Sequence, residues 1–216
     1  MRKRMIFADR TEAGRLLGER LAALDLVRPV VLALPRGGVP VGAAIAAALK
    51  SPLDVVFVRK LGAPDQPELA IGAVADGAEP ELVLNDKLLA ALNIDEAYIT
   101  ATVQKELAVI EQRRKAYEGL RPKLELTGRS VVVTDDGVAT GMTMQAALRQ
   151  VRRRAGSVIA AVPVASAEAL AMLRAEADQV VCLSAPKGFH SVGGQYRDFA
   201  QVTDEDVLAI LRHPAG

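Results

Sequence analysis

Short segments in which every residue is apolar recur along the chain, separated by longer segments with helical spacing. Clear examples are residues 30–34, 131–133 and 158–162. A strand that is apolar at every position must be buried on both faces, and alternation of such strands with helices is typical of a helix-covered parallel sheet. The sequence therefore predicts an α/β fold with a mostly parallel sheet flanked by helices on both faces.

These patterns also predict the order of the elements. Asp9 and Thr203 each precede a helix and have an acid three residues later, which is the spacing of a capping box. Residues 61–75 are rich in glycine and proline and are expected to form a loop. The expected strands are residues 29–34, 53–58, 81–84, 130–134, 158–162 and 180–183, and the expected helices are residues 9–24, 39–49, 95–117, 143–154, 167–175 and 203–212.

The length of 216 residues predicts a single domain, because domains average roughly 100–200 residues and no linker-like tract divides the chain. We expect residues 1–216 to form this domain. Its core would span about residues 25–183, with a small hood formed by the N-terminal helix and residues 184–216. The long, charged helix at residues 95–117 is expected to face solvent or a second subunit.

Charge and hydropathy exclude several classes of protein. Lys and Arg number 27 against 26 Asp and Glu, and this near-neutral balance argues against a general nucleic-acid or membrane-surface binder. No segment approaches the roughly 18 apolar residues of a membrane span. The N-terminal apolar run stops at Asp9, which is too short for a signal peptide, so a cytoplasmic location is expected. The single cysteine, Cys182, is expected to lie buried in a strand.

Residues 131–143 carry the clearest chemical signal. A buried strand ends in Asp135 and Asp136, and a glycine-containing turn then leads into a helix. Two adjacent carboxylates in this position are costly unless they bind hydroxyl groups or a divalent cation. The turn, with Thr140 and Thr143, aims backbone N–H groups and hydroxyls into a concavity at a helix N-terminus, which favours a phosphate. Together these features indicate a ligand such as a ribose 5-phosphate.

The structural alternative is a capped strand–turn–helix whose acids face solvent. Other phosphate motifs do not fit: the chain has no G-x-x-x-x-G-K-[ST], and residues 34–42 lack the G-x-G-x-x-G spacing. Ligands of parallel sheets bind at the carboxyl ends of the strands. Further site residues are therefore expected in residues 35–38, in residues 59–60 and from residue 184 onward.

Residues 135–143 resemble the motif with which type I phosphoribosyltransferases bind 5-phosphoribosyl 1-diphosphate (PRPP). The order of residues 34–38, 58–60 and 67–74 before this motif is similar to a bacterial subgroup of that family whose acceptor is unassigned. The resemblance implies a Rossmann-like core with a small hood. It also implies Mg²⁺-dependent transfer of ribose 5-phosphate from PRPP to a nitrogenous, nucleobase-like acceptor, with release of diphosphate.

The resemblance assigns roles within the motif. Asp135 and Asp136 would bind the ribose 2- and 3-hydroxyls, and Asp136 would be catalytic. Mg²⁺ would be held by the diphosphate and the ribose hydroxyls, with assistance from Asp135 or Asp136. The 5-phosphate would bind to the turn formed by Gly137, Val138, Ala139, Thr140, Gly141, Met142 and Thr143.

The resemblance also assigns the diphosphate to Arg36, Gly37, Gly38 and Lys60, with Arg36 and Lys60 as catalytic cations. From the residues alone, a plain tight turn and a solvated strand end remain alternatives. Residues 61–75 resemble the mobile lid of the family, but they contain no Lys or Arg, in contrast to orotate-type members. Cationic charge would then come from Arg36, Lys60 and the metal.

Residues 184–199 follow the last expected strand and contain two of the four Phe, one of the three Tyr and one of the two His. Phe189 could stack on a planar acceptor, and Lys187 or His190 could contact an acceptor carbonyl. The alternative is a loop held by aromatic packing. The expected partners are PRPP and a small planar acceptor, with no nucleic acid and no membrane, and a homodimer is common in the family.

Two other functions would use the same pocket. A regulatory protein would bind PRPP or a nucleotide without turnover. The lack of cations in residues 61–75 favours this function, whereas Arg36 and Lys60 favour an enzyme. A phosphohydrolase would release phosphate without an acceptor. No Ser/His/Asp triad or Cys/His pair indicates a covalent nucleophile.

Overall fold

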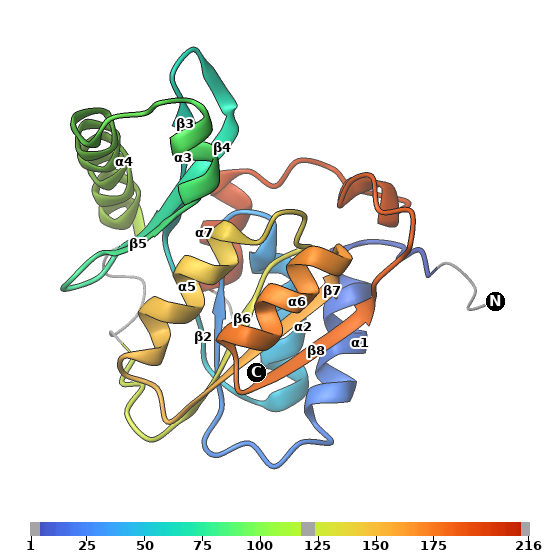
Figure 1. The fold of residues 1–216 in the computed structure, drawn as a ribbon. Coiled ribbons are helices and arrows are strands. Elements are labelled where there is room, and N and C mark those ends of the chain that lie inside the picture. Colours follow the sequence, from blue (N-terminus) through green and yellow to red (C-terminus); the bar gives the residue numbers. More distant parts are fainter. Residues whose placement is uncertain (1–4, 118–123, 213–216) are drawn as a thin grey trace.

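The computed structural model describes residues 5–117 and 124–212 of the chain. Figure 1 shows its elements coloured along the sequence. In chain order they are α1 (Arg10–Leu21), β1 (Val30–Ala33), α2 (Gly38–Leu49), β2 (Leu53–Val55), β3 (Val58–Ala63), β4 (Gln66–Ala75), β5 (Glu81–Leu84), α3 (Asp86–Ala91), α4 (Glu96–Tyr117), β6 (Ser130–Thr134), α5 (Met142–Arg152), β7 (Ser157–Val164), α6 (Ala167–Glu176), β8 (Gln179–Ser184), the 3-10 helix η1 (Gly193–Gln195) and α7 (Asp204–Arg212).

A five-stranded parallel sheet with the order β2-β1-β6-β7-β8 lies at the centre of the molecule. Its register places Ala33 of β1 beside Thr134 of β6, and Thr134 beside Ala161 of β7. This confirms the predicted parallel sheet. The segments that follow β1 and β6 therefore start next to each other at one edge of the sheet.

Both faces of this sheet are apolar, and each is covered by helices. In β1, Val30 and Leu32 belong to a cluster with residues of α5 and α6, whereas Val31 and Ala33 cluster with residues of α1, α2 and α7. Figure 1 shows these two helical layers on opposite sides of the strands. Burial of each Val or Leu side chain stabilises the fold by about 1.5–3 kcal/mol, which explains why these strands are apolar at every position.

A second, antiparallel sheet with the order β3-β4-β5 forms the hood. One face of this sheet packs against α3 and α4 in a cluster that includes Leu61, Ile71 and Ile110. The other face packs against α5, where Ala73 meets Ala146. Figure 1 shows the hood projecting at the upper left with α4 on its outer side. Helix α5 thus connects the hood to the central sheet.

The prediction that residues 61–75 form a loop is wrong, because they form most of the β3–β4 hairpin. The hairpin turns at Asp65, whose φ is 56°. A Cβ at Gly62 would lie 2.7 Å from the Pro67 carbonyl oxygen, so this glycine allows the two strands to approach. Residues 66–69 are exposed, and for that reason the hairpin lacks the apolar alternation that identifies strands in a sequence.

The predicted strand at residues 53–58 is also wrong in its second half. β2 ends at Val55, the chain then leaves the central sheet, and Val58 begins β3 of the hood. Arg59 and Lys60 consequently lie within the antiparallel sheet rather than at the carboxyl end of a parallel strand. A continuous apolar run does not reveal a change of sheet, because strands of both sheets need apolar residues.

The hood is built from other residues than the sequence indicated. The separate layer comprises β3 to α4, which the sequence patterns had placed in the core. Helix α1 instead packs along α2, where Gly14 and Gly18 allow close contact with Val41 and Ala48. From the C-terminal segment, Leu211 of α7 is buried in the core beside α2. Helix α1 and α7 therefore belong to the helical layer of the core.

Helix ends follow the predicted caps. Asp9 Oδ1 accepts a hydrogen bond from the Glu12 N–H at 2.8 Å, and Thr203 Oγ1 accepts one from the Asp206 N–H at 3.1 Å. Both predicted N-caps are therefore confirmed. Helix α3 was not predicted, because it is only six residues long, buries no residue and leaves no periodic signal.

Cys182 lies in a strand, as predicted, but it is only half-buried. The reason is that β8 is an edge strand with β7 as its single neighbour. The Cys182 thiol donates to the Ser184 carbonyl at 3.2 Å, and burial raises its pKa.

The acid at the start of β8 gives a testable prediction about stability. Asp178 Oδ2 accepts from the Val158 N–H at 2.7 Å, and Oδ1 accepts from Arg152 at 3.0 Å. The bond to the Val158 N–H, followed by Arg152, lowers the pKa of Asp178. Its charge therefore stabilises the fold above the pKa of the unfolded chain, and this contribution is lost as the pH falls through the folded pKa.

We expect Asp178→Asn, which resembles the protonated acid, to lower the free energy of unfolding by about 1 kcal/mol at neutral pH. The magnitude is small because the side chain is 43% exposed. Urea unfolding at neutral pH and at about pH 3 should show the difference between variant and wild type shrinking in acid. An equal difference at both pH values would contradict this account.

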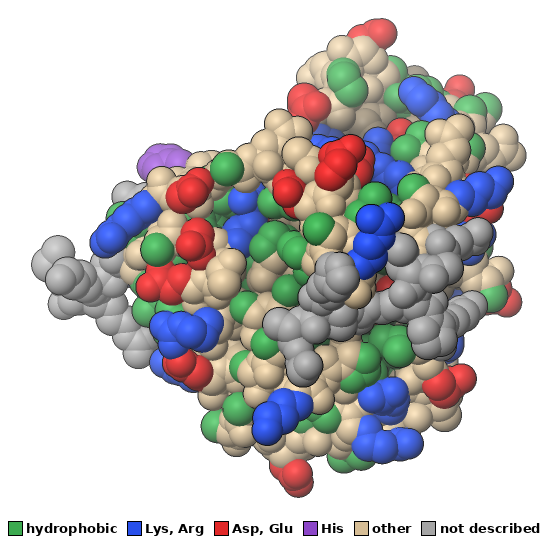
Figure 2. Space-filling model, turned by 180° about the vertical axis from the view of Figure 1, so that it is seen from behind, with side chains coloured by type: hydrophobic (Ala, Val, Ile, Leu, Met, Phe, Trp, Pro, Cys, Tyr) green, Lys and Arg blue, Asp and Glu red, His purple; other side chains and the backbone are tan. Residues whose placement is uncertain are grey.

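Acidic and basic side chains are interspersed over the face shown in Figure 2, in keeping with a net charge of +1. Across residues 5–117 and 124–212, every helix is too short or too polar to traverse a lipid bilayer.

Candidate functional site

Asp135 and Asp136 directly follow β6, at the edge of the sheet where β1 also ends. The Asp136 N–H donates to Asp135 Oδ1 at 2.8 Å, which holds the first carboxylate against the backbone of the second. Both residues are half-buried. The alternative in which these acids face open solvent therefore does not describe the structure.

Burial perturbs both carboxylates of the pair. Burial, followed by the negative charge of Asp136, raises the pKa of Asp135 well above its usual range. Burial also raises the pKa of Asp136, although the guanidinium of Arg10 opposes this shift. A buried acid pair with one counter-ion is electrostatically costly. Ligand hydroxyls or a cation would reduce that cost.

The counter-ion, Arg10, was not identified from the sequence. Its Nε donates to Asp136 Oδ2 at 2.9 Å, and the two side chains are 11% and 14% exposed. Arg10 is the first residue of α1, where a positive charge is unfavourable for the helix dipole. A cation at this position is a weak sequence signal that the side chain has another partner.

Two aromatic residues from the C-terminal segment complete this side of the site. The Tyr196 hydroxyl donates to the Asp136 carbonyl at 2.6 Å, and burial raises the pKa of Tyr196. The Phe199 ring lies under Arg10, with the guanidinium carbon 3.8 Å from the ring centroid. The aromatic packing that was the alternative for residues 184–199 is thus present at Tyr196 and Phe199.

The glycines after β1 allow α2 to begin against the acid pair. A Cβ at Gly38 would lie 2.9 Å from Asp135 Cα, and a Cβ at Gly37 would collide with the Asp136 carboxylate. The peptide bond between Pro35 and Arg36 is cis. The structure therefore brings Arg36, Gly37 and Gly38, here called the diphosphate loop after their predicted role, to the acid pair. Their contact with a diphosphate remains a prediction.

The turn after the acid pair is anchored to the sheet by Val138. The Val138 N–H donates to the Val164 carbonyl at 2.9 Å, and the Val138 carbonyl accepts from the Ser166 N–H at 3.0 Å. Ser166 also donates through its hydroxyl to the Ala139 carbonyl at 2.7 Å. The carbonyls of Val138 and Ala139 thus accept hydrogen bonds from Ser166, on the side of the turn that faces β7 and α6.

The N–H groups of the same turn are free to bind a ligand. In the described part of the chain, the backbone N–H groups of Ala139, Thr140 and Gly141 donate to no protein acceptor. Gly141 has a φ of 90°, which favours glycine, and it precedes the first residue of α5. Free N–H groups beside a helix N-terminus form a site for an anion such as a phosphate.

A cavity of about 410 Å³ lies between these elements. Arg36, which lines it, is 3.7 Å from Asp204 of α7 through Nη1 and Oδ2. The residues that line the cavity are Arg10, Arg36, Gly37, Asp136, Phe199, Gln201 and Val202. The cavity is therefore lined by one carboxylate of the acid pair, two guanidinium groups and the residue that precedes α2.

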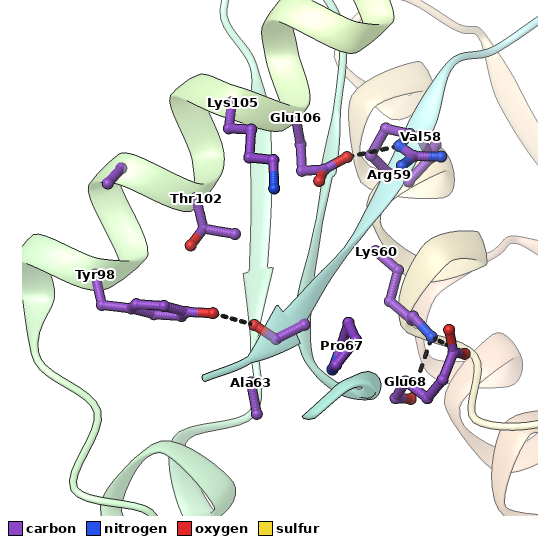
Figure 3. A pocket seen from close by; sticks show the side chains of 12 residues that line it. Val58, Arg59, Lys60, Ala63, Pro67, Glu68, Tyr98, Thr102, Lys105 and Glu106 are labelled. Atoms are coloured by element: carbon purple, nitrogen blue, oxygen red, sulfur yellow. Dashed lines mark hydrogen bonds and ion pairs between the residues drawn. The ribbon is translucent and has the colours of Figure 1, made fainter. Parts of the chain in front are cut away.

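Lys60 lies in a different cavity, of about 580 Å³, between the β3–β4 hairpin and α4. Figure 3 shows Lys60 pointing away from the α4 residues, toward Glu68 of the same hairpin. Its ammonium bonds to the Glu68 carboxylate at 3.0 Å and to the Glu68 carbonyl at 3.1 Å. Across the cavity Arg59 pairs with Glu106 at 2.6 Å. The role of Lys60 toward a diphosphate remains a prediction.

The residues suggested for the acceptor lie elsewhere. Phe189 packs beside the cluster of Phe7 and Tyr196, and Lys187 and His190 are exposed. The residues that line the two cavities do not include them. Their contact with an acceptor also remains a prediction.

The fold and this arrangement define a phosphoribosyltransferase domain. The family model of the phosphoribosyl transferase domain matches residues 8–197, and the chain belongs to this family. The crystal structure of TT1426 from Thermus thermophilus is 50% identical in sequence and superposes with a TM-score of 0.82, covering 98% of this chain and all of that one (100%).

Two curated relatives from Mycobacterium tuberculosis are similar over nearly the whole chain. They are named "Putative phosphoribosyl transferase Rv0571c" and "Putative phosphoribosyl transferase MT0597". Each is 44% identical over 207 residues, which is 95% of this chain and 46% of the relative. The chain thus spans about half the length of these relatives.

Proposed function

We propose that this domain transfers ribose 5-phosphate from PRPP to a nitrogenous, nucleobase-like acceptor and releases diphosphate. The observation that supports this function best is the meeting of three features at one sheet edge. They are the acid pair after β6, the turn with free N–H groups before α5, and the glycine start of α2. PRPP carries the groups that these three features suit: ribose hydroxyls, a 5-phosphate and a diphosphate.

In this proposal Asp135 and Asp136 accept hydrogen bonds from the ribose hydroxyls. The turn at residues 137–143 binds the 5-phosphate through N–H groups and the hydroxyls of Thr140 and Thr143. Anchoring of the turn to β7 and α6 through Val138 fixes the sugar relative to the diphosphate loop. Such positioning supplies much of the rate enhancement in a displacement reaction.

The bond from ribose C1 to the diphosphate oxygen breaks, and its electron pair leaves with the diphosphate. The lone pair of an acceptor nitrogen forms the new bond to C1, and the nitrogen then releases its proton. Arg36, beside the glycine start of α2, would stabilise the negative charge that develops on the leaving group. The protein thereby acts by positioning and electrostatics, without a covalent intermediate.

The acid pair fits a Mg²⁺ ion that binds together with the substrate. Among the described residues, no three His, Cys, Asp or Glu side chains gather into a metal site made by protein alone. Mg²⁺ is commonly held by one or two carboxylates and by substrate phosphates. Asp135 or Asp136 would be a ligand: Asp135 Oδ1 accepts from the Asp136 N–H and Asp136 Oδ2 accepts from Arg10, so each carboxylate keeps one further oxygen. Bound Mg²⁺ would make diphosphate a better leaving group.

A regulatory protein that binds PRPP without turnover is the second candidate. Residues 61–75 contain no Lys or Arg. Lys60, which immediately precedes them on the hairpin, is paired with Glu68. A hairpin without free cations would contribute little to stabilising a leaving diphosphate.

Release of diphosphate tests the proposal. We expect the protein, with PRPP and Mg²⁺, to release diphosphate only when a member of a panel of purine, pyrimidine and related ring-nitrogen compounds is added. Calorimetric binding of PRPP without release for any acceptor would favour the regulatory protein. Release of inorganic phosphate without an acceptor would indicate a phosphohydrolase. Failure to bind PRPP would refute all three.

A further inference from the structure

The cavity beside Asp136 is lined by two guanidinium groups, and one of them comes from outside the sequence motifs. Arg36 belongs to the diphosphate loop, whereas Arg10 comes from α1. Gly37 at the start of α2 lines the same cavity, so the positive end of a twelve-residue helix is also present. Asp136 is the one acid among the lining residues, and Asp204, which does not line the cavity, lies 3.7 Å from Arg36. The cavity is thus suited to an anion that lies next to the ribose-binding acid.

Arg10 is held firmly and retains unused donors. Its Nε donates to Asp136, its Nη1 donates to the Ala200 carbonyl at 2.7 Å, and its guanidinium stacks on Phe199. A guanidinium has five N–H donors, and the described residues provide partners for two of them. Because the side chain is already ordered, binding an anion would cost little further conformational entropy.

This arrangement compensates for the missing charge of the hairpin. A leaving diphosphate carries several negative charges, whereas residues 61–75 carry no cation and Lys60 is paired with Glu68. Arg10 reaches the site from α1, outside the hood, and lines the same cavity as Arg36. Its position is set by Asp136, which would contact the ribose, so its charge would lie close to the diphosphate.

We propose that Arg10 is a substrate-binding and catalytic residue that contacts the diphosphate together with Arg36, in place of the cations that the hairpin lacks. This inference rests on the proposed function. In this proposal Arg10 makes two contributions. It orients the Asp136 carboxylate, and its remaining N–H groups donate hydrogen bonds to the diphosphate. The second contribution distinguishes the proposal from a purely structural ion pair.

Calorimetry with inorganic diphosphate in the presence of Mg²⁺ tests the second contribution, because this ligand has no ribose. We expect Arg10→Ala to weaken diphosphate binding by about 10-fold or more, and Arg10→Lys to restore part of the loss. Arg15→Ala is the matched control. Arg15 lies on the same helix, its side chain is 57% exposed, and it pairs with Glu19. We expect this control to bind diphosphate like the wild type.

Parallel titrations with ribose 5-phosphate separate the two contributions. We expect Arg10→Ala to weaken ribose 5-phosphate binding less than diphosphate binding. Unchanged diphosphate affinity in Arg10→Ala, or a loss confined to ribose 5-phosphate, would overturn the inference and leave Arg10 as a support for Asp136. These titrations are compared with a titration of the wild type with PRPP, which tests the proposed function separately. Failure of the wild type to bind PRPP would instead refute the proposed function itself.

Discussion

Replacing both Asp135 and Asp136 with Asn is expected to abolish measurable binding of PRPP. Each carboxylate would accept charged hydrogen bonds from ribose hydroxyls, and such bonds contribute about 1.5–3 kcal/mol each. Loss of two of them corresponds to at least about a 100-fold decrease in affinity. Isothermal titration calorimetry with PRPP and Mg²⁺ measures this directly.

Loss of binding in this variant should not result from unfolding. Burial raises the pKa of both acids, which shows that their charges are unfavourable in the folded protein. Neutral amides of the same size remove that cost, while Arg10 loses its ion-pair partner. The two changes oppose each other, so we expect the midpoint of thermal unfolding to shift by only a few degrees.

Asp178→Asn provides the matched control for the acid pair. Asp178 also flanks a strand of the central sheet, but it lies at the amino end of β8, away from the carboxyl edge. It should lower stability slightly and leave PRPP affinity unchanged. If the double variant binds PRPP as tightly as the wild type does, the assignment of this edge as a ribose site is refuted.

The motif after β6 could be identified from the sequence because its parts are contiguous. The acids, the turn and the start of α5 follow one another within residues 134–143, so spacing alone predicts their neighbourhood. The central strands were predicted for a similar reason, since burial on both faces leaves uninterrupted apolar runs.

Contacts between distant segments could not be predicted in this way. Arg10 and Asp136 are 126 positions apart, and Tyr196 and Asp136 are 60 apart. Nothing local to α1 specifies that its first residue meets the end of β6. A small hood was predicted, but its residues were assigned wrongly, because the hairpin that forms it is exposed at the tip and buried at the base and so lacks regular alternation.

A side chain at Gly38 is expected to damage both the fold and the site. A Cβ there would lie 2.9 Å from Asp135 Cα and 2.9 Å from the Thr134 carbonyl oxygen. These are backbone atoms of β6 and its end, so they cannot rotate away as a flexible side chain would. Gly38→Val must therefore push the start of α2 away from the acid pair. We expect it to lower the free energy of unfolding by about 1–3 kcal/mol.

The same displacement should weaken PRPP binding by about 10-fold or more, because misplacement of catalytic groups by roughly an ångström has effects of this size or larger. Gly188→Val is the matched control, since a Cβ at Gly188 would meet no atom within 4 Å. Urea unfolding and calorimetry on both variants measure the two effects. If Gly38→Val lowers stability but leaves PRPP affinity intact, then close contact between α2 and the acid pair serves the fold and not the ligand. Loss of both properties at Gly38, with neither lost at Gly188, would show that the approach of α2 to β6 builds the site.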